Sequence, residues 1–66
     1  MIKRLHVLNG AESHNFEVGK SYVHFTTDQM VKEIIAGAFD NGGYRVVFED
    51  GSHVDVITNN VLVFNS

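Results

Sequence analysis

The last third of the chain, residues 44–64, constrains the fold more than any other segment, because its alternating side chains set a strand register. Residues two apart along a strand share one face of a sheet. This spacing gives two apolar sets, with Tyr44, Val46 and Phe48 in one strand and Val54 and Val56 in the next. The two sets must lie on the same side of the pair, since a slip of one residue would move a whole set to the wrong face.

The turn between these strands decides how they pair. A two-residue turn at Asp50-Gly51 would set Val46 opposite Asp55 and so mix core with charge. A three-residue loop, Glu49–Gly51, with a left-handed glycine in a bulge, instead sets Val46 opposite Val54. It also sets Arg45 opposite Asp55, a favourable cross-strand charge pair. The sequence therefore predicts the longer loop, with a second face made of Arg45, Val47, His53 and Asp55.

The final strand, Val61–Phe64, follows a turn signal at Asn59-Asn60 and is apolar at every position. A strand with one face in water normally alternates, so we expect both faces of this one to be covered, by a closed barrel or by a second subunit. A domain of 66 residues without cysteine has no disulfide to stabilise it, and small domains of this kind often oligomerise. The sequence therefore predicts a homo-oligomer.

The first part of the chain reads as two strands and a loop within one domain that spans residues 1–66. Ile2–Leu8 is predicted to be a strand that ends at Asn9-Gly10, and Ala11–Asn15 a polar loop. Phe16–Phe25 is predicted to be a strand with a break or bulge at Gly19.

Residues 27–39 fit two structures. Met30, Val31, Ile34 and Ile35 fall at helical spacing, which favours a helix. Three of these four are β-branched, and Gly37 would cost a helix about 1 kcal/mol, which favours a strand. Asn41-Gly42 is also a hairpin signal into the strand that begins near Tyr44.

The run VKEIIAGAFDNGGYRVVFEDGSHVDVITNNVLVF, residues 31–64, resembles the back half of small Src-homology-3-like or Sm-like barrels. Those folds run from a bent strand through a strand that ends near Asp-Gly to a closing apolar strand. The resemblance implies an all-β fold, either a small barrel or a twisted antiparallel meander of five to six strands. The alternative is an α+β fold, with one helix at 27–39 packed on an antiparallel sheet. No functional residue of the Sm proteins carries over to this chain.

Composition excludes several classes of function. The formal net charge is −3 and the five basic residues form no cluster beyond Lys3-Arg4, which disfavours nucleic-acid binding. No run is long or apolar enough for a membrane helix, and the lack of cysteine is typical of a cytoplasmic protein. The four histidines have no partner at the short spacing of metal ligands, so we expect surface imidazoles, no metal and no cofactor.

Catalysis is not predicted. The serines lack a nucleophile context, and the Gly19-Lys20-Ser21 run lacks the earlier glycine of a phosphate-binding loop. A chain of this size also has little room to enclose an active site alone. We therefore expect a non-catalytic protein.

Two functional hypotheses follow, with nucleic-acid binding by a Sm-like barrel as a less favoured third. The first is an interaction protein that acts as a homo-oligomer, of the kind that phages use as accessory inhibitors of a host protein. The second is a protein that sequesters a small anionic ligand such as a nucleotide signal, in pockets between subunits. Tyr22 and Tyr44 carry hydroxyl groups that suit the edge of a groove. The candidate ligand or interface residues are Lys32, Gly42, Gly43, Tyr44, Arg45, His53, Asp55, Leu62 and Phe64.

Overall fold

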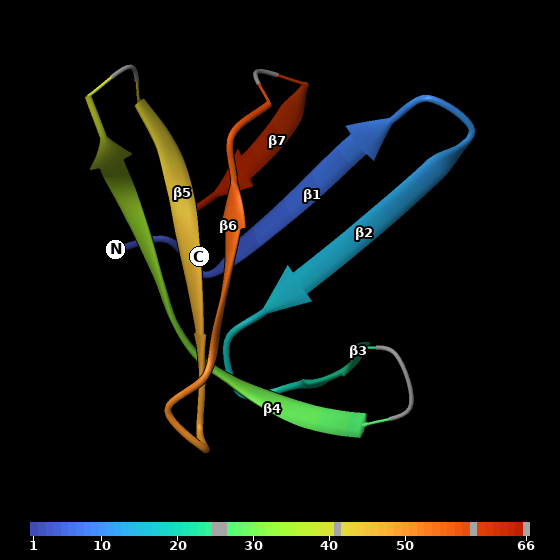
Figure 1. Cartoon of the computed structure of the whole chain (residues 1–66), viewed down its shortest axis with the longest axis vertical. Helices are drawn as coiled ribbons and strands as arrows, with labels where there is room; N and C mark the ends of the chain where they lie inside the picture. The colour runs from blue at the N-terminus through green and yellow to red at the C-terminus, as the bar shows by residue number, and fades with distance from the viewer. Residues whose placement is uncertain (25–26, 41, 59, 66) are drawn as a thin grey trace.

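A computed structural model describes residues 1–24, 27–40, 42–58 and 60–65, without the side chains of residues 23, 24 and 27. These residues form seven strands and no helix (Figure 1). The strands are β1 (Arg4–Asn9), β2 (Glu12–Glu17), β3 (Ser21–His24), β4 (Thr27–Phe39), β5 (Gly42–Phe48), β6 (His53–Val56) and β7 (Val61–Phe64). The predicted all-β fold is confirmed. Within the described ranges the structure has no helix with the length and hydropathy needed to cross a membrane.

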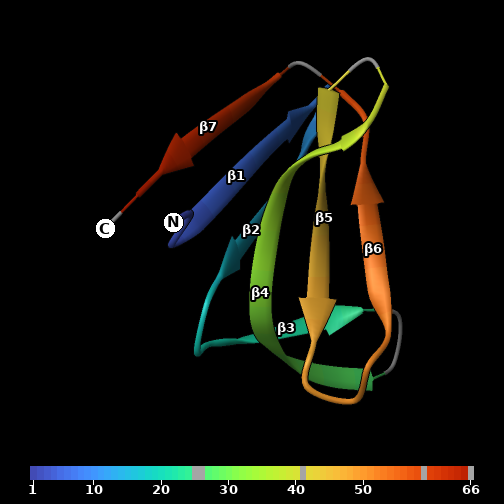
Figure 2. The same cartoon turned by 90° about the vertical axis from the view of Figure 1, so that its left-hand side faces the viewer.

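Two curled antiparallel sheets make a half-barrel. One sheet has the strand order β2-β1-β7, and the other has the order β3-β4-β5-β6. Figure 2 shows the two sheets side by side, with β4 curving along one flank of the molecule and β3 crossing near its lower end. The first and last strands of the chain are neighbours, since Arg4 is paired with Phe64.

β4 is the long strand that gives the second sheet its curl. Its first four residues pair with β3, and the rest pair with β5. The register with β5 shifts twice, between Val31 and Glu33 and again between Ala36 and Phe39. Gly37 lies inside the second shift with a φ of +67°, as expected for an irregularity that only glycine adopts easily. The helix offered as an alternative for 27–39 is therefore wrong, because the helical spacing of its apolar residues arises from these shifts in a strand.

The β5–β6 hairpin has the predicted register. Tyr44 is paired with Val56, Arg45 with Asp55, Val46 with Val54 and Val47 with His53. The loop has three residues, and Gly51 has a φ of +89°. The Gly51 amide donates to the Phe48 carbonyl at 3.0 Å, and the Phe48 amide donates to the Ser52 carbonyl at 2.9 Å. In addition, the Asp50 carboxylate accepts hydrogen bonds from the amide and the hydroxyl of Ser52, at 2.9 and 2.5 Å.

The N-terminal part departs from the prediction. The polar loop predicted for 11–15 is wrong, because Glu12–Glu17 is β2 and pairs with β1 along its whole length. Most residues of β2 are polar and exposed, but one face of the strand points inward and carries His14 and the buried Phe16. The break predicted at Gly19 is confirmed as a turn between β2 and β3. The extra strand raises the count from the expected five or six to seven among the described residues. Phe25, Asn41 and Asn59, which belong to the strand and turn predictions, lie outside the described residues.

The core lies between the two sheets. Its buried side chains are Leu5, Val7, Phe16, Val31, Ile34, Val46, Phe48 and Val56. Val46 and Phe48 belong to the face that the register assigned to the core, and Tyr44 and Val54 are half-buried against it. Each fully buried side chain of this size contributes about 1.5–3 kcal/mol through the hydrophobic effect.

β7 ends its sheet. It is paired with β1 and with no other described strand. Leu62 is 50% exposed and Val63 is 39% exposed, although both are apolar. The closed barrel that was one of the two predicted covers for this strand is therefore wrong. Cover by a second subunit stays a prediction.

Candidate functional site

A pocket lies where β6 faces the β1–β2 hairpin across the gap between the sheets. Its volume is about 620 Å³. Its lining residues come from β1, β2, β3, β6 and the segment that follows β6: Val7, Asn9, His14, Phe16, Tyr22, Val54, Asp55, Val56, Ile57 and Thr58. The walls of the pocket are mostly apolar.

A polar pair, His14 and Tyr22, stands in one wall. The His14 Nδ1 atom and the Tyr22 hydroxyl oxygen lie 2.7 Å apart and share a hydrogen bond. The His14 Nε2 atom lies 3.7 Å from a carboxylate oxygen of Glu12. When the imidazole is neutral with its proton on Nε2, Nδ1 is free to accept the hydrogen bond from the tyrosine hydroxyl.

Burial and charge both disfavour ionisation of Tyr22. Partial burial raises the pKa of the Tyr22 phenol, because the phenolate would lose hydration, and the negative charge of Glu12 raises this pKa further. The hydroxyl therefore keeps its proton at neutral pH and serves as a hydrogen-bonding group.

The aromatic ring of Tyr22 joins two core side chains. It lies 4.4 Å from the Phe16 ring, centroid to centroid, and 6.4 Å from the Phe48 ring. These contacts link β2, β3 and β5, and they hold the hydroxyl at the pocket wall. Tyr22 was singled out for a groove edge from the sequence, and it lines this pocket.

His14 and Phe16 are not among the site residues that the sequence predicts. His14 falls in the predicted loop 11–15, and Phe16 begins the strand predicted after it. A signal was present in ESHNFE: Glu12, His14 and Phe16 alternate with small or polar residues. This period of two is typical of a strand with one inward face. With His14 placed on the inward face beside Phe16, this period predicts both β2 and the part of the pocket wall that β2 forms.

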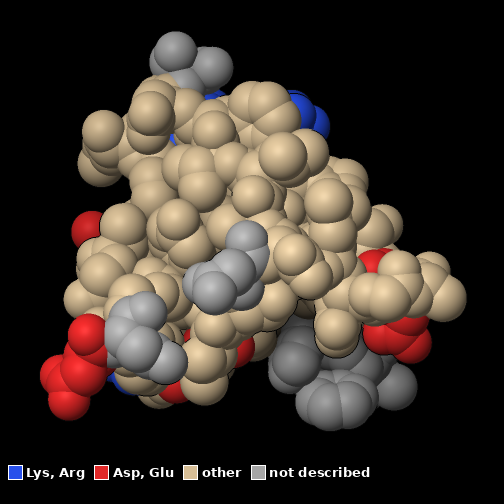
Figure 3. All heavy atoms as spheres, turned by 90° about the horizontal axis from the view of Figure 1, so that it is seen from above, with Lys and Arg blue, Asp and Glu red and all other residues tan. Residues whose placement is uncertain are grey.

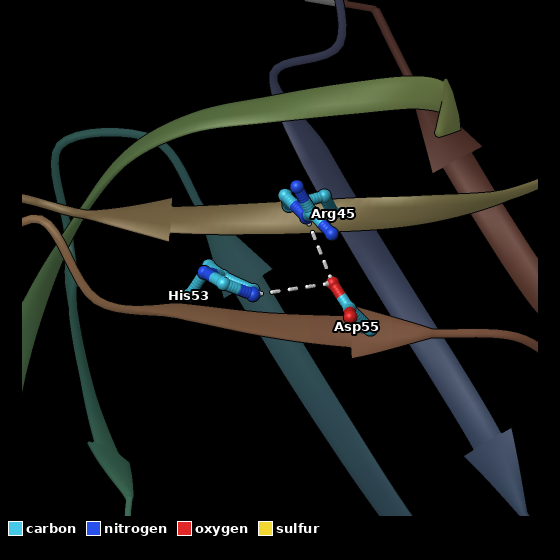
Figure 4. A network of polar contacts seen from close by, with 3 residues as sticks. All are labelled: Arg45, His53 and Asp55. Carbon is cyan, nitrogen blue, oxygen red and sulfur yellow. Dashed lines mark hydrogen bonds and ion pairs between the residues drawn. The ribbon is translucent and has the colours of Figure 1, made fainter. Parts of the chain in front are cut away.

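Three residues of the predicted second face form a polar network (Figure 4). Arg45 donates a hydrogen bond from Nε to Asp55 Oδ1 at 2.9 Å, and His53 Nε2 lies 3.8 Å from the same oxygen. The hydrogen bond from Arg45 lowers the pKa of the Asp55 carboxyl, and the nearby positive charge acts in the same direction. The predicted Arg45–Asp55 pair is therefore confirmed, and the charge of Arg45 is largely matched within the chain.

The other residues of the predicted ligand group are not brought together. Tyr44 packs against the core, and none of Tyr44, Arg45, Gly42 and Gly43 lines either pocket. The space beside Gly43 is already filled, because a Cβ atom there would lie 2.9 Å from the Phe39 ring and 3.0 Å from the Val56 carbonyl oxygen. Lys32 lines a smaller pocket of about 240 Å³ near the N-terminus.

Leu62 and Phe64 lie together on the outer face of the three-stranded sheet. Their pairing partners on β1 are His6 and Arg4, which alternate with the buried Leu5 and therefore point outward. The guanidinium carbon of Arg4 lies 3.9 Å from the centroid of the Phe64 ring, a cation–π contact. Leu8, 43% exposed, belongs to the same face. We call Leu8, Leu62 and Phe64 the outer apolar patch.

Among the described residues, no group of three or more histidine, aspartate or glutamate side chains is placed to hold a metal ion. Comparison with protein-family models, with curated proteins and with solved structures finds no match to this chain. β7, the outer apolar patch and the pocket are the features of the described residues that bear on function.

Proposed function

We propose that this chain is a non-catalytic interaction protein that acts as a homo-oligomer, with β7 as its contact strand. The observation that carries the proposal is the position of β7 at the edge of its sheet with Leu62 and Val63 exposed. An edge strand of this kind pairs readily with another strand, and natural proteins usually protect such edges with charge or proline. The strand Val61–Phe64 has neither.

The hydrogen-bonding pattern of β7 supports pairing at its outer edge. The Leu8 amide donates to the Asn60 carbonyl at 2.8 Å, which identifies that pair as hydrogen-bonded. In an antiparallel ladder, hydrogen-bonded and non-hydrogen-bonded pairs alternate. The backbone groups of Val61 and Val63 therefore point away from β1, toward the free edge.

These groups define the geometry of a symmetric dimer. If two copies of β7 pair antiparallel, Val61 of one exchanges hydrogen bonds with Val63 of the other, and Leu62 faces its own symmetry mate. The outer apolar patches of both copies then join into one surface across the two-fold axis. Closed two-fold contacts of this self-complementary kind are the commonest form of homo-oligomer.

The experiment that tests the proposal is sedimentation equilibrium over a wide range of concentrations. The wild-type chain is expected to associate, and Leu62→Lys should weaken the association at least tenfold, because two ammonium groups would meet on the axis. A tenfold change corresponds to about 1.4 kcal/mol. The matched control is Met30→Lys, which places the same charge on an apolar residue of β4 that is 42% exposed.

A mixing experiment separates lost contact from lost folding. Leu62→Lys and Leu62→Glu should each be monomeric, and their mixture should form a heterodimer, because the opposite charges face each other. A wild-type chain that stays monomeric at every concentration would refute the proposal. Association that is equally sensitive to Met30→Lys would place the contact elsewhere.

We further propose the cytoplasm as the site of action, in keeping with a chain that has no cysteine. A protein target for the oligomer, with the chain as an inhibitor or adaptor, is the narrower form of the proposal. The net charge of −3 supports a target with a basic face.

A further inference from the structure

The pocket between β6 and the β1–β2 hairpin has features of a ligand site that the proposed self-association does not use. Its volume of about 620 Å³ lies within the range of about 300–1,000 Å³ that small-molecule sites occupy. It opens between two free sheet edges, since β2 and β6 each end their sheet. None of the β7 residues lines it.

The walls of the pocket favour a flat apolar molecule. Val54 and Val56 form one side, and Val7 and Phe16 form the other. The Phe16 and Tyr22 rings, 4.4 Å apart, are held by contacts with each other. Aromatic rings fixed in this manner offer faces and edges on which another aromatic ring packs well.

The charge around the pocket selects against anions. None of the ten described residues that line it is a lysine or an arginine. Asp55 alternates with Val54 and Val56, so its carboxylate lies on the other face of β6, where it pairs with Arg45. The Arg45 guanidinium that pairs with Asp55 comes from a residue outside the lining. A second carboxylate, that of Glu12, lies against His14 on the opposite wall. Figure 3, which views the molecule from above, shows acidic and basic atoms alike only around the margins of its described surface.

Two polar groups lie at the pocket wall. The first is the Tyr22 hydroxyl, which shares a hydrogen bond with His14. The second is the backbone of Asp55: Phe48 and Ser52 form a hydrogen-bonded pair, so by alternation the Arg45–Asp55 pair is not hydrogen-bonded through its backbone. The amide and carbonyl of Asp55 therefore point away from β5, at the free edge of β6 that lines the pocket.

We propose that this pocket binds a small aromatic molecule that carries no negative charge. The ligand packs between the valine side chains of β6 and the Phe16 and Tyr22 rings. A polar substituent hydrogen-bonds to the Asp55 backbone. Nucleotides and other anionic ligands fit this site poorly.

A matched set of probes tests the proposal on the full chain. Naphthalenemethanol, naphthalenemethylamine and naphthoate share one ring system and differ in charge. The chain has no tryptophan, so the fluorescence of the naphthalene ring reports binding directly. The neutral and cationic probes should bind at least tenfold more tightly than the anionic probe. Amide chemical shifts should change at Val7, Tyr22 and Val56.

Two variants locate the site. Val54→Phe fills the pocket and should weaken the binding of the neutral and cationic probes at least tenfold. The matched control, Val47→Phe, adds the same ring to the opposite face of the same hairpin and should leave their affinities unchanged. If Val54→Phe does not fold, the amide shifts at Val7, Tyr22 and Val56 with the neutral probe decide the matter instead. Repeating the titrations with Leu62→Lys separates this site from self-association. Absence of binding by all three probes, or equal binding of naphthoate, would overturn the proposal.

Discussion

Two adjacent glycines at the start of β5, Gly42 and Gly43, differ in what an added side chain would meet. The difference separates two contributions to the loss of folding stability, backbone strain and crowding. Both have a positive φ, +100° and +82°. A Cβ atom at Gly42 would meet nothing within 4 Å. A Cβ atom at Gly43 would lie 2.9 Å from Phe39 Cδ2 and 3.0 Å from the Val56 carbonyl oxygen. Alanine at either position suffers backbone strain, but alanine at Gly43 also suffers crowding.

The expected magnitudes follow from these contacts. Strain at a positive φ costs an alanine about 1–2 kcal/mol at either position. Crowding adds about 1–3 kcal/mol at Gly43. The Phe39 contact is with a side chain, whereas the Val56 carbonyl belongs to the backbone of a strand position that is paired with Tyr44 and cannot withdraw freely. The loss of unfolded-state entropy is common to both substitutions and cancels in their difference.

We therefore expect Gly43→Ala to destabilise the protein by about 1–3 kcal/mol more than Gly42→Ala. For a domain of this size, the gap corresponds to at least about 4 °C in Tm. Urea denaturation followed by far-ultraviolet circular dichroism measures it, and unchanged m-values would show that the denatured states are comparable. Equal destabilisation by the two substitutions would refute the reasoning, because it would mean that the space beside Gly43 is not filled.

Two further predictions concern titration. Asp55 has a lowered pKa in the folded chain, so its pairing with Arg45 stabilises the fold above the unfolded pKa of about 3.9, and this contribution is lost as the pH falls through the folded pKa. Thermal unfolding measured from neutral to acidic pH should therefore show a weaker acid dependence of Tm for Asp55→Asn than for the wild type. Identical profiles would count against the pair. Tyr22 has a raised pKa, so its phenol stabilises the fold below about pH 10 and loses this contribution as the pH rises through the folded pKa. A Tyr44→Phe background leaves Tyr22 as the one tyrosine. Ultraviolet titration of its phenolate should then give a midpoint above the usual tyrosine pKa of about 10, and Glu12→Gln should lower that midpoint. A midpoint unchanged by Glu12→Gln would show that this carboxylate does not act on Tyr22.

The C-terminal hairpin could be predicted from sequence because local rules agree there. The apolar alternation, the glycine at the bulge and the Arg45–Asp55 charge pair all require one register, and the structure has it. Few other segments offer three independent constraints on the same pairing. Because these local constraints agree, the sequence alone determines the register of the β5–β6 hairpin.

The pocket could not be predicted, because it depends on residues that break the local rules. His14 is a polar side chain on an inward face, and it is accommodated there because it bonds to the Tyr22 hydroxyl from another strand. Gly37 disturbs the period of β4, so that a bent strand resembles a helix in its apolar spacing. Both effects come from contacts between segments that the sequence alone does not bring together.

The pairing of β1 with β7 has a consequence for how the chain resists force. Neighbouring strands in the sequence form every other ladder among the described residues, whereas this ladder joins the two ends of the chain. Arg4 faces Phe64, and the Lys3 amide donates to the Phe64 carbonyl at 2.7 Å, so both termini leave from the same end of the ladder. Tension applied between the termini would therefore open its hydrogen bonds one after another, as a zipper opens, rather than shear them all at once. Because its closure spans nearly the whole chain, this ladder is also the one we expect to form last during folding.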